Sequence, residues 1–287
     1  MKSTAFDTIY LNVPQAEKEQ LIRFRATHPV KNVTAAGARW ENISCGRGEQ
    51  ALLLLPGALG IGEMAFQHIL AFENEYRVIS PTYPSAITTM AQLVEGIVGI
   101  LDAENVRQAH VLGSSYGGMV AQCLVRQYPD RLGKLILSHT GGPKPKRAGK
   151  NKKFIAALRL LPIGLWRALL RLVTRKVLSE APAQQAFWQA YSNEMIATMT
   201  KADLVSRYQV ATDFDENCTF ARDDLVGWPG SILILEGEDD PLAEARERDA
   251  LKALYPQAQV HTFHGTGHIA SVAKLEEYVS VVQAFLS

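Results

Sequence analysis

The chain has 287 residues, of which 47% are hydrophobic and 21% are charged, as in ordinary folded globular proteins. Its formal net charge of +1 provides no overall field for gathering nucleic acid, so we expect no nucleic-acid partner. No apolar run reaches the ~18 residues of a membrane span, and the N-terminal stretch lacks the apolar core of a signal peptide. The three cysteines form no CxxC pair. They indicate reduced thiols, and hence a cytoplasmic protein without a metal site.

The expected elements alternate between strand and helix along most of the chain. A short amphipathic helix at 14–27 belongs to an N-terminal extension that covers residues 1–30. Two strands then meet at a turn at 36–37, and the apolar run ALLLLP at 51–56 predicts a strand buried on both faces. Further along, the pattern predicts in order a helix at 63–74, a strand at 76–81, a helix at 88–104, a strand at 108–113, a helix at 116–129 and a strand at 133–139.

The alternation stops at Gly141 and resumes at Ser231. Between them, residues 143–228 read as helix or irregular chain, and strand, helix, strand and helix then follow at 231–238, 243–256, 259–265 and 271–286. We therefore expect an α/β core domain made of residues 31–142 and 229–287, with a mostly parallel sheet flanked by helices on both faces. Residues 143–228 would form a helical cap inserted after the sixth strand.

The segment HVLGSSYGGMVAQ, at 110–122, places a serine-rich corner between an expected strand and an expected helix. Residues Gly113 to Gly117 fit the pattern G-x-S-x-G with Ser115 at its centre. In this pattern the serine occupies a strained strand-to-helix turn, and the small flanking residues let neighbouring backbone pass close by. Ser115 is therefore the candidate nucleophile. The alternative is that it only caps the following helix.

A serine hydroxyl needs a base to take its proton, and the base needs a carboxylate to orient it. The late loop FHGTGHIASV offers His268, with His264 as the rival nearer the strand end. The loop ILILEGEDDPLAE offers Asp240, which precedes a proline and is thereby restricted to extended geometry. Asp239 is the second choice, and either aspartate could merely cap a helix. The order Ser…Asp…His is the one expected on a parallel sheet.

The negative charge that develops on a substrate oxygen needs preorganised N–H donors. One candidate is the backbone N–H of Tyr116, at the start of the helix that follows the serine. The other lies in LLLLPGALGIGE, where Gly57 lets the chain turn after the buried strand. The Ala58 N–H is the first candidate there and the Leu59 N–H is the second. The alternative is that this loop is only a turn out of the strand and holds no oxyanion donor.

These features together resemble the α/β-hydrolase fold superfamily with a cap domain, over nearly the whole chain from about residue 31. Within it, LLLLPGALGIGEMAFQHI, YRVISPTYP and GSSYGGMVAQ look more like the maspardin-type branch than like lipases. The resemblance implies Ser115 as nucleophile, His268 as base, Asp240 as acid, and Ala58 and Tyr116 as oxyanion donors. Two departures are a Pro-Gly where the family usually has His-Gly, at 56–57, and PTYPSA in place of Asp-x-x-Gly.

The resemblance implies a serine hydrolase without a cofactor, acting on carboxylic esters of small to medium apolar acyl groups. A nucleophilic aspartate at position 115 would instead have indicated dehalogenase or epoxide hydrolase chemistry. Two alternatives stay open. The chain could be a binding or receptor protein with little turnover, or the same triad could serve perhydrolysis, thioester cleavage or C–C bond hydrolysis.

The expected cap begins with a strongly basic segment. It carries eleven Lys and Arg from Lys144 to Lys176 and no acid, so the rest of the chain is acidic by about ten charges. Pro162 should end one helix and start another near Ile163. The second helix either packs its apolar face on the site, contacts an anionic lipid surface weakly, or recognises an anionic substrate or partner. The sequence does not indicate an oligomeric state.

Aromatic residues of the cap are expected to line or brace an apolar pocket above the serine. The alternative is that they form the core of the cap, the commoner location for such residues. The candidates for substrate contact are Trp166 and Trp188 in the cap and Leu59 and Tyr83 in the core, while Phe154, Phe187 and Tyr191 would support them.

Overall fold

The computed structural model describes residues 5–179 and 184–287, and it contains one eight-stranded sheet in the order β1-β2-β4-β3-β5-β6-β7-β8. The first two strand pairs, β1 with β2 and β2 with β4, are antiparallel, and all the others are parallel. The strands are β1 (Lys31–Ala35), β2 (Ala38–Cys45), β3 (Ala51–Leu55), β4 (Arg77–Thr82), β5 (Ala109–Ser114), β6 (Leu132–Ser138), β7 (Ile232–Gly237) and β8 (Gln259–Phe263).

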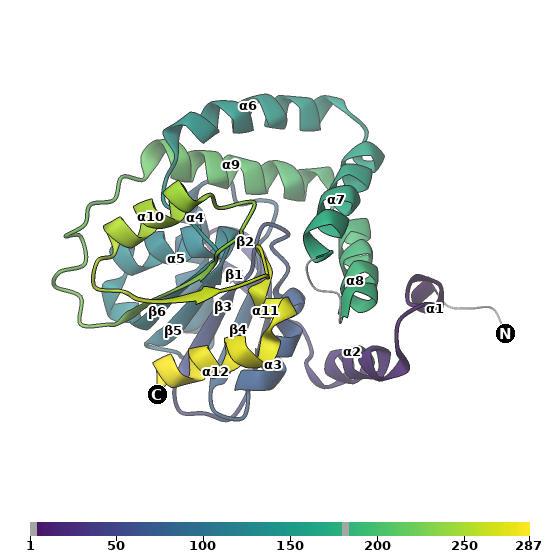
Figure 1. The fold of residues 1–287 in the computed structure, drawn as a ribbon, viewed down its shortest axis with the longest axis horizontal. Coiled ribbons are helices and arrows are strands. Elements are labelled where there is room, and N and C mark those ends of the chain that lie inside the picture. The colour runs from purple at the N-terminus through teal and green to yellow at the C-terminus, as the bar shows by residue number, and fades with distance from the viewer. Residues whose placement is uncertain (1–4, 180–183) are drawn as a thin grey trace.

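Helices cover both faces of the sheet (Figure 1). The helices and 3-10 turns of the core are α1 (Ala5–Ile9), α2 (Gln15–Thr27), η1 (Gly62–Ala65), α3 (Phe66–Phe72), α4 (Met90–Ala103), α5 (Tyr116–Gln127), η2 (Pro129–Arg131), α10 (Ala245–Leu254), α11 (Ala270–Ala273) and α12 (Leu275–Leu286). Alternate residues of β3 point to opposite faces, as the pleat of a strand requires. Leu53 packs in the cluster with α4 and α5, whereas Leu52 packs in the cluster with α3 and α12.

Four further helices lie between β6 and β7: α6 (Pro145–Leu160), α7 (Ile163–Leu178), α8 (Gln185–Thr198) and α9 (Lys201–Asn217). Figure 1 shows α6 lying along α9, and α7 beside α8. Pro162 separates α6 from α7, as the sequence predicts, because a proline cannot donate to the preceding turn. The α/β-hydrolase architecture, with helices inserted after the sixth strand, is confirmed.

The N-terminal segment packs tightly instead of extending freely. Tyr10 and Phe24 are buried in the cluster that includes helices α3 and α8. Arg25 donates to Glu63 at 2.7 Å and to Glu194 at 2.9 Å, so one guanidinium joins α2 to η1 and α8. Within the described residues, no helix is both long and apolar enough to cross a membrane.

The close packing of α4 on the sheet depends on one glycine. A Cβ at Gly96 would overlap the indole ring of Trp40, which is fully buried. We expect Gly96→Ala to lower the free energy of unfolding by about 1–3 kcal/mol, the usual cost of overpacking. Gly149→Ala in α6 is the matched control, since no heavy atom lies within 4 Å of its added Cβ. The control should raise stability by roughly 0.5–1 kcal/mol. Urea unfolding of both variants measures these changes. Equal changes in the free energy of unfolding in the two variants would contradict the expectation.

Candidate active site

Ser115 occupies a sharp corner between β5 and α5. Its backbone has φ 52° and ψ −111°, a conformation that non-glycine residues rarely adopt. The flanking glycines make the corner possible, because a Cβ at Gly113 would overlap the Gly117 carbonyl and one at Gly117 would overlap the Leu55 carbonyl. The Ser115 N–H donates to the Ser138 carbonyl at 2.8 Å. The corner is therefore held by neighbouring backbone and projects the hydroxyl beyond the strand end.

A line of hydrogen bonds joins the serine to residues far downstream. The Ser115 Oγ lies 3.0 Å from His268 Nε2, and His268 Nδ1 lies 2.7 Å from Asp240 Oδ2. The other oxygen of Asp240 accepts from the backbone N–H groups of Leu242 and Ala243. The structure thus brings together the three residues that the sequence singled out, in the order of contact that proton transfer from the serine requires.

The Asp240 carboxylate is almost fully buried, with 1% of its side chain exposed. Burial raises its pKa, but the hydrogen bond from His268 and the backbone N–H of Leu242 outweigh burial and hold the pKa below its ordinary value. The group is therefore negatively charged at neutral pH and opposite the imidazole. The rivals lie elsewhere: Asp239 accepts from the Gly267 N–H, and His264 pairs with Glu238 at the surface.

The loop after β3 approaches the serine closely. A Cβ at Gly57 would lie 3.8 Å from Ser115 Cβ, and Ala58 lines the same two cavities as Ser115. Tyr116 is the first residue of α5, so its N–H has no acceptor within the helix. Both expected oxyanion donors therefore lie beside the hydroxyl.

Two cavities meet at Ser115 and His268. The apolar chamber has a volume of about 370 Å³ and the basic chamber about 380 Å³. The apolar chamber is lined by hydrophobic side chains that include Met64, Leu170, Val173, Val177, Leu178 and Trp188. The basic chamber is lined by polar and cationic side chains that include Thr140, Lys144, Arg147, Asn151 and Arg207. A substrate that fills both would place two chemically different halves on either side of the hydroxyl.

The four residues expected to contact substrate divide into two pairs. Leu59 lines both chambers and Trp188 lines the apolar one. Trp166 instead packs into the core of the inserted helices, with its ring centroid 4.7 Å from that of Phe154. Tyr83 lies behind the Ala58 loop, where its hydroxyl donates to the Pro56 carbonyl at 3.2 Å. Sequence pattern did not distinguish these positions, because all four are large apolar or aromatic residues and only the packing of the elements decides which of them reach a cavity.

Arg207 of α9 is a residue that the sequence did not single out. It is 4% exposed, and it lines the basic chamber. Its guanidinium donates to the Tyr83 carbonyl and lies against the α-carbon of Gly60 in the Ala58 loop. No carboxylate pairs with it within the described parts of the chain, and burial lowers its pKa. A buried guanidinium that forms no ion pair is a candidate contact for an anionic group of a substrate.

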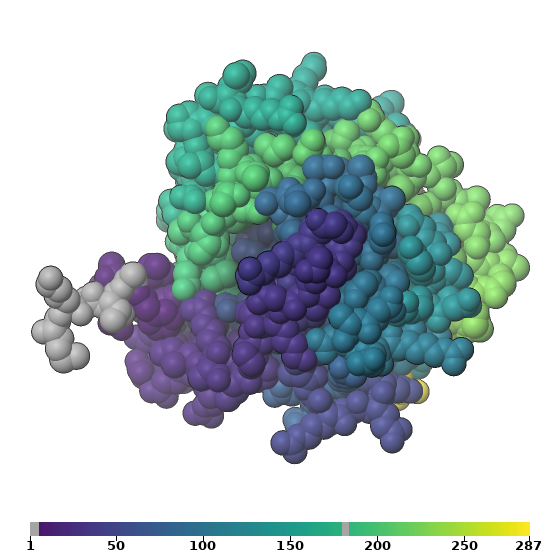
Figure 2. Space-filling model, turned by 180° about the vertical axis from the view of Figure 1, so that it is seen from behind, coloured from purple at the N-terminus to yellow at the C-terminus, as the bar shows by residue number. Residues whose placement is uncertain are grey.

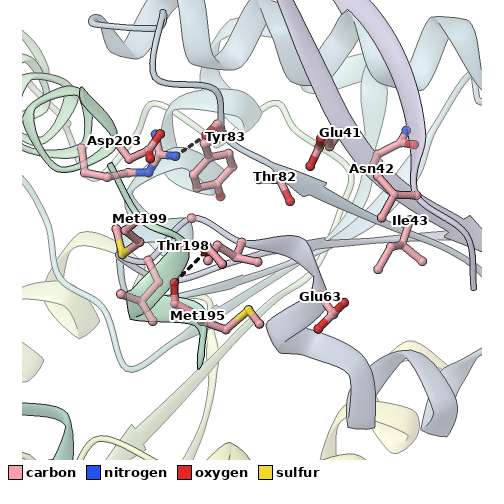
Figure 3. A pocket seen from close by; sticks show the side chains of 15 residues that line it. Glu41, Asn42, Ile43, Glu63, Thr82, Tyr83, Met195, Thr198, Met199 and Asp203 are labelled. Atoms are coloured by element: carbon pink, nitrogen blue, oxygen red, sulfur yellow. Dashed lines mark hydrogen bonds between the residues drawn. The ribbon is translucent and has the colours of Figure 1, made fainter. Parts of the chain in front are cut away.

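A third cavity of about 250 Å³ lies behind the Ala58 loop (Figure 3). Its walls come from β2, the end of β4 and the helices α8 and α9, and neither Ser115 nor His268 lines it. Figure 2 shows the hollow between the purple N-terminal strands and the green helices. Arg207 and Leu59 line this cavity as well as the basic chamber, so they form the partition between the two.

Two histidines that line the chambers beside the triad were also missed. His139 lines the basic chamber, and its ring lies edge-on to that of His268 with centroids 5.7 Å apart. His68 lines the apolar chamber. Burial lowers the pKa of each to about 4, so both are neutral at pH 7. The one signal for His139 is its position directly after a parallel strand, where sites form on such sheets. His68 carried no signal.

His28, Cys45 and Glu73 form a cluster of potential metal ligands within the described residues. The imidazole of His28 lies 2.7 Å from the carboxylate of Glu73. Burial, and then the nearby Glu73, raise the pKa of the Cys45 thiol to about 12. The thiol is therefore protonated at neutral pH.

Comparison with known proteins agrees with this geometry. The chain is 25% identical over 278 residues to a 2-hydroxymuconate semialdehyde hydrolase of Pseudomonas putida, covering 90% of this chain and 94% of that protein. It is 22% identical over 230 residues to the esterase YbfF of Escherichia coli, covering 77% and 83%. The crystal structure of a hydrolase from Pseudomonas aeruginosa superimposes with a TM-score of 0.75 at 23% identity, covering 90% and 98%. The sequence profile of the alpha/beta hydrolase fold matches residues 50–274. The chain therefore belongs to the alpha/beta hydrolase fold family.

Proposed function

We propose that the protein is a serine hydrolase that cleaves carboxylic esters of small to medium apolar acyl groups through an acyl-enzyme. The observation that carries this proposal is the unbroken line of hydrogen bonds from Asp240 through His268 to Ser115, located where two chambers meet. Because a neutral hydroxyl becomes an effective nucleophile only beside a base, this arrangement supplies the requirement for attack on a carbonyl carbon.

In the first half-reaction, Ser115 Oγ attacks the ester carbonyl while His268 Nε2 takes the hydroxyl proton. Asp240 stabilises the imidazolium that forms and keeps its ring in place. The carbonyl oxygen becomes negative and accepts from the N–H groups of Ala58 and Tyr116. The carbon–oxygen bond to the alcohol then breaks, and His268 gives its proton to the departing oxygen.

In the second half-reaction, a water molecule loses a proton to His268 and attacks the acyl carbon bound to Ser115. The bond to Ser115 Oγ breaks, the serine recovers the proton from His268, and the carboxylic acid leaves. The neutral His139 beside His268 adds no positive charge there, so it does not oppose formation of the imidazolium.

The two chambers define the substrate further. We assign the acyl group to the apolar chamber and a leaving group that carries a carboxylate to the basic chamber, near Arg207. Helices α6 to α9 all contribute lining residues, which supports residues 143–228 as a cap domain over the core at 31–142 and 229–287. The apolar chamber alone would accept many esters, so the basic chamber would discriminate between substrates with and without a carboxylate.

The basic chamber also favours a second candidate function, hydrolysis of a C–C bond beside a ketone or aldehyde in a carboxylated substrate. In that reaction the carbonyl carbon gains the oxygen of water and the departing carbon gains a proton. The relative from Pseudomonas putida is named for a muconate semialdehyde, which carries a carboxylate.

Replacement of the nucleophile provides the most direct test. We expect Ser115→Ala to lower turnover of a short p-nitrophenyl ester by about four orders of magnitude, because triad members act as a unit. The adjacent Ser114→Ala is the matched control and should stay within about tenfold of wild type, since Ser114 takes no part in proton transfer. Steady-state release of p-nitrophenolate measures both. Ser115→Ala activity within tenfold of wild type would disprove the assignment.

A fluorophosphonate probe separates an enzyme from a binding or receptor protein on the same fold. Wild type should become labelled on Ser115 at neutral pH, as located by peptide mass spectrometry, because the probe reacts with an activated serine. Labelling should disappear in Ser115→Ala and persist in Ser114→Ala. A wild-type protein that stays unlabelled would favour the receptor alternative.

A matched pair of esters tests the role of Arg207. We expect wild type to prefer 3-butyryloxybenzoate over 3-butyryloxybenzamide in kcat/KM, and Arg207→Gln to reduce that preference by roughly 10-fold or more, the value of a hydrogen bond to a charged group. The ratio within one variant cancels any general loss of activity. Arg159→Gln, at an exposed position of α6, should keep the wild-type ratio. An unchanged ratio in Arg207→Gln would refute the assignment.

The second candidate function has its own assay. If it is correct, incubation with 2-hydroxymuconate semialdehyde yields two fragments whose masses add up to the substrate plus one water, and Ser115→Ala abolishes them. Intact substrate after incubation with an enzyme that is active on esters would exclude it.

A further inference from the structure

The helix α7 presents an apolar face to solvent. The stripe is defined by three leucines of α7 with exposed fractions of 44% to 65%: Leu165, Leu169 and Leu172. Their spacing of three or four residues places them on one side of the helix. Helices of water-soluble domains normally bury such a face, and a contiguous exposed one marks an interaction site. We call these three residues the α7 stripe.

An adjoining side of the same helix lines the apolar chamber. Leu170, Val173 and Val177 contribute to the apolar chamber. Figure 1 shows α7 with α8 at one end of the cap, and Figure 2 shows the teal residues of α6 and α7 along the outer margin of the molecule. The stripe and one wall of the apolar chamber therefore belong to the same helix.

Helices α6 and α7 carry positive charge that acidic side chains do not fully compensate. Lys144, Arg147 and Lys152 pair with acids of neighbouring elements. The other exposed cations of α6 and α7 pair with no acid in the described ranges of the chain: Lys146, Lys150, Lys153, Arg159, Arg171, Arg175 and Lys176. The remainder of the chain carries 19 basic and 29 acidic side chains. Helices α6 and α7 thus form the positive pole of the molecule.

We propose that this face docks on an anionic lipid bilayer, with the α7 stripe inserted among the headgroups and the flanking Lys and Arg against lipid phosphates. A bilayer surface offers anionic groups directly above an apolar layer, which matches leucines flanked by cations. A symmetric dimer through the same face would instead oppose two positive poles. Nucleic acid would leave the leucines against phosphates, and the aromatic side chains nearby, Phe154 and Trp166, point into the cap core.

Docking in this way places the apolar chamber next to the membrane, so an apolar substrate dissolved in lipid would reach Ser115 without crossing water. The inference goes beyond the ester hydrolysis proposed above and does not depend on it, because binding to vesicles requires no turnover. The Ser115→Ala protein should bind as wild type does.

The test is co-sedimentation of the full chain with vesicles. Wild type should pellet with vesicles of phosphatidylcholine and phosphatidylglycerol and stay in solution with phosphatidylcholine alone. Raising the salt from about 0.1 M to about 1 M shortens the screening length from about 10 Å to about 3 Å and should release the protein. Equal binding to both vesicles, or no binding to either, would overturn the proposal.

Two triple variants separate the apolar and electrostatic contributions. Arg171→Gln/Arg175→Gln/Lys176→Gln should weaken partitioning roughly 100-fold, at about fivefold per charge. Its control, Arg23→Gln/Arg222→Gln/Arg246→Gln, removes three exposed cations elsewhere and should change partitioning by less than tenfold. A similar loss in both would mean that net charge alone drives binding and would contradict a specific face.

Leu165→Gln/Leu169→Gln/Leu172→Gln should lose vesicle binding by at least 10-fold while keeping wild-type turnover of a dissolved p-nitrophenyl ester, since these positions line neither chamber. Its control replaces three exposed apolar residues elsewhere, Leu11, Ile22 and Val226, with Gln and should bind as wild type. Light scattering of the free proteins completes the test. A wild-type dimer that this stripe variant converts to monomer would show that the stripe joins two copies and would overturn the proposal.

Discussion

The contact between Ser115 Oγ and His268 Nε2, at 3.0 Å, is the constraint on which the rest of the structure depends. It joins side chains 153 residues apart, so it exists only if the chain returns to the same edge of the sheet. Parallel strands bring the chain back to this edge each time, because the carboxyl ends of all parallel strands lie on the same edge of the sheet. β5 delivers the serine, β7 the aspartate loop and β8 the histidine loop, and the continuous pairing from β5 to β8 sets their spacing.

Holding this contact requires several locally unfavourable features, and the surrounding core stabilises them. Ser115 has a positive φ, and Asp240 and Arg207 are buried ionisable groups. Strained backbone and buried charge persist only where neighbouring structure over-determines them. The fully buried strands β3 and β7 provide that rigid support. The backbone N–H groups that meet Asp240 compensate its lost hydration.

The inserted helices supply much of the lining of the two chambers next to Ser115. They close one chamber with hydrocarbon and add polar and cationic side chains to the lining of the other, so the same hydroxyl faces two different environments. Arg207 connects these roles because it lies against the loop of Ala58, binds the Tyr83 carbonyl and lines the basic chamber. A change in the position of α9 would therefore alter both the Ala58 loop and the basic chamber. The α7 helix similarly contacts the apolar chamber on one side and solvent on the other.

The sequence by itself determined the layered fold and the three residues of the hydrogen-bonded line. Hydrophobic period, turn chemistry and the glycines at 113 and 117 are local properties, and local properties are what a sequence displays directly. It also indicated Ala58 and Tyr116, because both follow strands whose ends meet. Only the tertiary structure decided which aromatic residues reach the chambers, placing Trp188 at the site and Trp166 in the cap core. It alone revealed Arg207, His139 and the outward stripe of α7. The physical reason is that burial and orientation depend on which helix packs against which, and the amphipathic pattern of α7 is the same whether its leucines face the core or the solvent.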